Sequence, residues 1–187
     1  MSPESFQAEA ISHYDHAGNA KKIKEEFMCR VIIHQAEEYF LKTGEISTPK
    51  GTNLFSGFIV NNLAPRFPHL LKCEPCNPDI LIVKDLDLNP LGFNACILHT
   101  PGQSPGSISI IVDDEIAIVG DTMFGVFMGS VFPPFADNVS QLLKACGILP
   151  ETKSKIFLPS HGGSKNRSQL LKDYQKRTLR LQVSSRD

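Results

Sequence analysis

Four of the six histidines occur in short motifs together with carboxylates, prolines or glycines. These motifs are Ser12-His13-Tyr14-Asp15-His16, His99-Thr100-Pro101-Gly102 and Pro159-Ser160-His161-Gly162-Gly163. Asp121 stands in a similar position, in Gly120-Asp121-Thr122 after an apolar run. Imidazole and carboxylate groups are ligands that suit zinc or another borderline divalent ion. If these side chains converge, they can hold one or two metal ions.

Short runs rich in β-branched residues surround the later motifs and predict strands. The predicted strands cover residues 80–83, 93–98, 108–112, 116–119 and 155–158. Asp113 and Asp114 separate two of these runs, which favours a tight hairpin between antiparallel neighbours. Apolar residues at helical spacing predict helices over 19–27, 138–148 and 168–181. Repeated glycines and prolines make 42–78 irregular, with room for one short helix.

Each motif falls at the end of a predicted strand or in the loop after it, or directly before a predicted helix. Loops at strand ends are held by a rigid sheet and are open to solvent, so functional groups gather there. The glycines beside the candidate ligands permit tight turns and close backbone approaches. Strands interleaved with helices predict a mixed α and β architecture.

Composition and charge argue against several classes of protein. With 187 residues and 41% hydrophobic residues, we expect one domain over residues 1–187 with its own core. The 19 Lys and Arg and 20 Asp and Glu give a net charge of -1, which argues against binding nucleic acid. The apolar run 108–112 is far too short to cross a membrane. Five scattered cysteines without a secretory signal favour a cytoplasmic protein.

In their order along the chain, these motifs resemble those of the metallo-β-lactamase-fold hydrolases. The matching strings are Ser12-His13-Tyr14-Asp15-His16-Ala17-Gly18-Asn19, His99-Thr100-Pro101-Gly102-Gln103-Ser104-Pro105-Gly106-Ser107, Gly120-Asp121 and Pro159-Ser160-His161-Gly162. The resemblance covers about residues 10–163, and residues 164–187 add a compatible C-terminal helix. It implies an α+β fold: an αββα sandwich of two sheets flanked by helices, with the metals at one edge.

Two features depart from the family pattern. The first motif is His-x-His-x-Asp-His in the family, whereas here Ile11 stands where the first histidine belongs. A deletion of two residues would give the same string. Since only about ten residues precede the motif, we expect part of the N-terminal sheet to be missing. An exposed sheet face and an unpaired edge would favour a homo-oligomer.

The resemblance implies two metal positions and assigns their ligands. One keeps His13 and His99, the other keeps Asp15, His16 and His161, and Asp121 bridges them. We therefore expect the second position to bind more tightly. Zinc is the expected metal, with iron or manganese as alternatives, and Asp15 is also the expected catalytic residue because it can orient the nucleophile.

The implied function is metal-assisted hydrolysis of a small-molecule substrate, with an ester or thioester preferred. A metal ion lowers the pKa of bound water from 15.7 to about 7 and polarises the bond that is cleaved. Two alternatives stay open. One is a catalytically inactive homologue that acts as a binding protein, and the other is an iron enzyme of the same fold acting on oxygen or a sulfur compound.

Other polar residues have simpler interpretations. Cys73-Glu74-Pro75-Cys76 has the spacing of a zinc or redox pair, but no second pair accompanies it. His34 and His69 stand outside the motifs and are interpreted as surface or core residues. The basic stretches 153–155 and 172–180 are interpreted as solvated surfaces.

Overall fold

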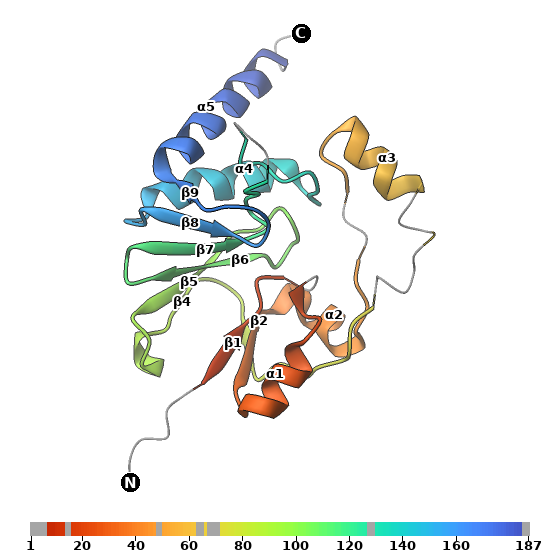
Figure 1. The fold of residues 1–187 in the computed structure, drawn as a ribbon, viewed down its shortest axis with the longest axis vertical. Helices are drawn as coiled ribbons and strands as arrows, with labels where there is room; N and C mark the ends of the chain where they lie inside the picture. The colour runs from red at the N-terminus through yellow and green to blue at the C-terminus, as the bar shows by residue number, and fades with distance from the viewer. Residues whose placement is uncertain are drawn as a thin grey trace.

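The computed structural model describes residues 7–13, 16–47, 50–62, 66, 72–126 and 130–184. Two β-sheets lie against each other, with helices on both outer sides (Figure 1). The smaller sheet is parallel and consists of β1 (Ala8–Ala10), β2 (Arg30–His34) and β3 (Ile80–Ile82). The larger sheet is mixed and consists, in order, of β4 (Leu86–Asp87), β5 (Ala95–His99), β6 (Ile108–Val112), β7 (Ile116–Gly120), β8 (Ile156–Pro159) and β9 (Lys165–Asn166).

The helices form the two outer layers. They are α1 (Ala20–Phe27), α2 (Glu38–Thr43), α3 (Leu54–Asn62), α4 (Val139–Ile148) and α5 (Arg167–Ser184), with 3-10 turns η2 (Gln35–Glu37), η5 (Asn89–Leu91) and η6 (Leu149–Glu151). In Figure 1, α1 and α2 lie beside the smaller sheet, and α4 and α5 lie beside the larger one. No helix in the described part of the chain is long and apolar enough to cross a membrane.

Three apolar clusters hold these layers together. Ile32 and Ile82 of the smaller sheet pack with Ile97 and Ile108 of the larger one, so the two sheets share a core. A second cluster joins the larger sheet to α4 and α5, and a third lies under α1 and α2. Burial of apolar side chains on both sides of each sheet is what an αββα sandwich requires. The predicted fold class is confirmed.

Most predicted elements of the later chain are present. The helix predicted over 138–148 begins after Asn138, whose side chain accepts a hydrogen bond from the Gln141 N–H at 3.0 Å. Such an N-cap satisfies one of the first amides of a helix. The hairpin between β6 and β7 turns at Asp113 and Asp114, which adopt φ values of 52° and 56°. Two positive φ values are typical of the type I′ turns that connect tight hairpins.

The smaller sheet contains three strands in the described residues, and β1 lies at its edge. β1 directly precedes the first motif and pairs with β2 on one side, in parallel. β2, which the sequence analysis did not identify, is buried at four of its five positions. The side of the sandwich next to β1 has a hollow of about 360 Å³, lined by apolar residues of both sheets such as Ala10, Ile32 and Ile110.

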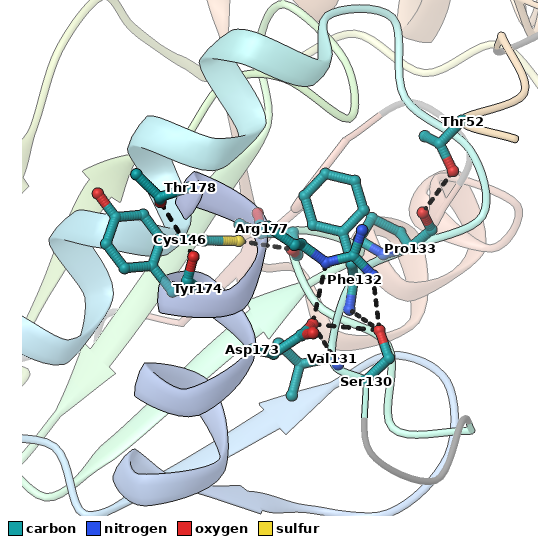
Figure 2. A network of polar contacts seen from close by, with 11 residues as sticks. Thr52, Ser130, Val131, Phe132, Pro133, Cys146, Asp173, Tyr174, Arg177 and Thr178 are labelled. Atoms are coloured by element: carbon teal, nitrogen blue, oxygen red, sulfur yellow. Dashed lines mark hydrogen bonds and ion pairs between the residues drawn. The ribbon is translucent and has the colours of Figure 1, made fainter. Parts of the chain in front are cut away.

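A buried carboxylate fixes α5 to the rest of the larger layer. The Asp173 carboxylate accepts hydrogen bonds from the Val131 N–H at 3.0 Å and the Ser130 hydroxyl at 3.1 Å (Figure 2). Arg177, one turn further along α5, donates to the same carboxylate at 3.1 Å and lies over the Phe132 ring at 4.0 Å. The segment that follows the end of β7 is thereby fastened to the C-terminal helix.

Candidate metal centre

The described residues of the first motif, Ser12, His13 and His16, lie between β1 and α1. The Ile11 N–H donates to the Ile32 carbonyl at 3.0 Å, which continues the pairing of the smaller sheet up to the motif. The His16 N–H then donates to the His13 carbonyl at 3.1 Å. This turn brings the two imidazoles together, with ring centroids 4.6 Å apart at an interplanar angle of 71°.

Asp121 and His161 reach the same place from two neighbouring strands. β7 and β8 are parallel, so both end at one edge of the larger sheet. The Ser160 N–H donates to the Gly120 carbonyl at 3.1 Å, which keeps the two strand ends in register beyond the last paired residues. Gly120 has φ 53°, and a β-carbon there would lie 2.8 Å from that of Ser12. The glycine therefore lets the end of β7 approach the first motif closely.

These turns surround the Asp121 carboxylate with imidazoles. Oδ2 lies 3.9 Å from Nε2 of His13, while Oδ1 lies 3.4 Å from Nε2 of His16 and 3.6 Å from Nε2 of His161. Asp121 is 5% exposed and His13 is 1% exposed, whereas His16 and His161 are 32% and 50% exposed. The group thus has a buried floor and a mouth open to solvent.

The donor set and its spacing fit a divalent ion. One ligand atom each from His13, His16 and Asp121 lies within 4.8 Å of the others. Ligand atoms around a tetrahedral zinc ion with bonds of 2.0–2.2 Å are roughly 3.4 Å apart, close to the spacing found here. The buried Oδ1 of Asp121 accepts no hydrogen bond from the described groups. A buried carboxylate oxygen without a hydrogen bond is unfavourable, and a cation bound beside it would stabilise it.

His99 is not brought into this group. Its Nε2 lies 3.0 Å from the Pro105 carbonyl oxygen, and its ring stacks on His34 at 4.1 Å with an interplanar angle of 10°. A carbonyl oxygen only accepts hydrogen bonds, so Nε2 carries the proton and is not available as a ligand in this arrangement. The structure therefore places His99 beside the smaller sheet, whereas the sequence analysis expected it at a metal position.

Asp15, a predicted metal ligand, and His69 lie outside the described residues.

The Cys73 and Cys76 pair has a structural explanation. Their N–H groups donate to the carbonyls of Gly44 and Leu41, at 2.8 Å and 2.9 Å. Burial raises the pKa of both thiols, which disfavours the reactive thiolate.

Sequence reasoning missed two carboxylates near the site. Asp137 donates its N–H to the Gln103 carbonyl at 3.0 Å, and burial raises the pKa of its carboxyl group, although the charges of Lys50 and His13 act in the opposite direction. Glu37 is completely buried and accepts hydrogen bonds from the loop that follows His99. Neither stands in a motif, and only their position in the folded chain reveals them.

Comparison with known proteins agrees with this geometry. Residues 12–161 match the metallo-beta-lactamase superfamily, and the chain belongs to that family. The solved structure of ST1585 from Sulfolobus tokodaii, described as a metallo-beta-lactamase superfamily protein, has a TM-score of 0.64 with 18% identity. That match covers 92% of this chain and 68% of the other chain.

Two relatives connect the family to hydrolysis. The chain is 32% identical to a probable metallo-hydrolase, YqgX of Bacillus subtilis, over 60% of this chain and 46% of YqgX. It is also 32% identical to the hydroxyacylglutathione hydrolase of Shewanella pealeana, over 40% of this chain and 28% of that enzyme. The chain thus spans less than half the length of both relatives.

Proposed function

We propose that this protein is a metal-dependent hydrolase that binds zinc through His13, His16 and Asp121. The observation that carries the proposal is the buried Asp121 carboxylate with three imidazoles within 4 Å of its oxygens. Membership of the family and the relation to a probable metallo-hydrolase support hydrolysis as the chemistry. Asp15 is proposed as a further ligand and as the residue that orients the nucleophile, because it directly precedes His16 in the motif.

Each side chain has a distinct part in such a site. A zinc ion held by His13, His16 and Asp121 would supply a water of lowered pKa and would polarise the substrate oxygen. Asp121 forms the floor, where its negative charge offsets the charge of the cation. The half-exposed ring of His161 lies at the mouth, with the Phe124 ring 4.8 Å away. We therefore expect substrate to enter from the side of His16 and His161, past the Phe124 ring.

We propose a small ester or thioester as the substrate. The support comes from the relative that is a hydroxyacylglutathione hydrolase. The leaving group of an activated acyl compound also needs less assistance than that of an amide. Both arguments concern the reacting bond and leave the rest of the substrate open.

Zinc analysis of the purified protein tests the site without a choice of substrate. We expect one or two zinc ions per chain by elemental analysis. Asp121→Asn should weaken zinc binding at least 10-fold in a competition titration with a chelator, because it removes a charged ligand. Asp114→Asn is the matched control, since Asp114 is exposed and lies on the hairpin turn.

The outcomes separate the alternatives. Zinc binding lost in Asp121→Asn, together with hydrolysis of a chromogenic ester or thioester that chelation abolishes, would support the proposal. Zinc bound at Asp121 without turnover of either substrate class would favour a binding protein. Equal zinc affinity in Asp121→Asn and Asp114→Asn would overturn the site.

A further inference from the structure

The loop between β5 and β6, residues 100–107, is buried to an unusual extent for a connection. Its buried members include Thr100, Gln103, Ser104 and Ser107, none of which is more than 3% exposed. Loops normally run over the surface because buried backbone groups need partners. This loop obtains partners internally: the Thr100 N–H donates to the Ser107 carbonyl at 2.9 Å, and the Ser104 N–H donates to the Ser107 hydroxyl at 3.0 Å.

Glu37 supplies the remaining contacts from a different layer of the fold. Its Oε1 accepts hydrogen bonds from the Ser104 hydroxyl at 2.8 Å and from the Gly106 N–H at 2.6 Å. A β-carbon on Gly106 would lie 2.5 Å from Cγ and 2.6 Å from Oε1 of Glu37. The glycine is therefore required for the carboxyl group to reach the loop.

A histidine pair fastens the same loop from the same side. His34 ends β2, and its Nδ1 accepts a hydrogen bond from the Ala36 N–H at 3.2 Å, which caps the turn that carries Glu37. The His34 ring stacks on His99, and Nε2 of His99 donates to the Pro105 carbonyl. Pro105 is thus held by His99, which stacks on His34, and Gly106 is held by Glu37, whose turn His34 caps.

The two ends of the loop connect to the candidate ligands. The Ile108 N–H donates to the Ser12 carbonyl at 2.9 Å, immediately before His13. At the other end, the Thr100 hydroxyl lies 3.2 Å from the Thr122 hydroxyl, immediately after Asp121. A displacement of the loop would therefore be transmitted to both sides of the metal centre.

We propose that Glu37 is a positioning residue that holds residues 104–106 in place and thereby keeps His13 and Asp121 at ligand distance. This inference rests on the proposed zinc site. Partners that orient metal ligands from outside the coordination shell typically contribute 10- to 100-fold in metal affinity. Glu37→Ala should therefore weaken zinc binding by at least 10-fold.

Conservative and steric variants separate positioning from general stability. Glu37→Gln keeps an oxygen acceptor at the same distance and should recover most of the zinc affinity lost in Glu37→Ala. Gly106→Ala, which pushes against the Glu37 carboxyl group, should weaken zinc binding with both carboxylate and loop hydrogen-bond donors still present. Leu170→Ala is the control. This side chain is fully buried in the cluster that joins the larger sheet to α4 and α5, so its loss lowers the melting temperature of the protein without a direct change in the loop.

Amide hydrogen exchange of the metal-free proteins gives a readout that does not depend on zinc. In Glu37→Ala we expect faster exchange at Gly106, Ile108 and the segment 120–122, with no change at Phe157 in β8. The proposal is overturned if faster exchange stays confined to 104–106, or if Glu37→Ala loses no more zinc affinity than Leu170→Ala does. If the wild-type protein binds no zinc but exchange spreads to 120–122, the zinc site fails while the coupling stands.

Discussion

Removal of the Asp173 carboxylate should be among the most damaging single changes outside the metal centre. Asp173 is 6% exposed and accepts from two backbone or hydroxyl donors as well as from Arg177 (Figure 2). Hydrogen bonds to a charged group contribute about 1.5–3 kcal/mol each, and breaking a buried ion pair costs about 3–5 kcal/mol. Arg177 is 32% exposed and can turn to water, which reduces the loss. We therefore expect Asp173→Ala to lower the free energy of unfolding by about 3 kcal/mol.

Urea denaturation followed by circular dichroism measures this change directly. The midpoint should fall with an unchanged slope, and the melting temperature should fall by roughly 6–12 °C, at about 2–4 °C per kcal/mol for a chain of this size. Glu115→Ala is the control, because its ion pair with Lys155 is exposed and contributes at most about 1 kcal/mol. A loss below about 1 kcal/mol in Asp173→Ala would show that water replaces these contacts and would refute the reasoning.

Two further predictions concern β1 of the smaller sheet and the hairpin turn between β6 and β7 of the larger sheet. Burial raises the pKa of Glu9 above its ordinary value of 4.5, so the folded state binds this proton more tightly, and stability is lost as pH rises through the folded-state pKa. Glu9→Gln should therefore be more stable than the wild type in thermal melts at pH 7, and a difference that persists unchanged well below pH 4.5 would contradict this assignment. At the hairpin turn, Asp114 has φ 56°. Both Asp114→Gly and Asp114→Val lose the ion pair with Lys153, so their difference isolates the backbone effect. Asp114→Gly should be more stable than Asp114→Val by about 1–2 kcal/mol in urea titrations; equal stabilities would mean that the turn relaxes.

The sequence predicted the larger sheet better than the smaller one, for a physical reason. The strands of β5 to β8 are short apolar runs bounded by turn residues, and the Asp113–Asp114 turn marks a hairpin locally. β2 is a parallel strand buried on both faces, so it shows no alternation of apolar and polar residues. β1 pairs with a strand that follows α1, and such pairing leaves no local signal.

The sequence motifs predicted part of the candidate site. They pointed to His13, His16, Asp121 and His161, and in the structure the three imidazoles lie around the Asp121 carboxylate. His99 shows the limit of the motif argument. It stands in the right string, yet the carbonyl of Pro105 and the ring of His34 hold it elsewhere. Glu37 was not predicted, because its partners are distant in sequence and belong to another layer.

The parallel pairing of β7 with β8 has a consequence for how the candidate metal centre assembles. The chain must pass through α4 before β8 can join β7, so Asp121 and His161 meet only after a long loop has closed. Contacts between distant segments form slowly because loop closure costs entropy before the contacts compensate it. During synthesis, His13, His16 and Asp121 leave the ribosome well before His161 does. The rate at which His161 joins the group around the Asp121 carboxylate should consequently be set by the docking of β8 onto β7.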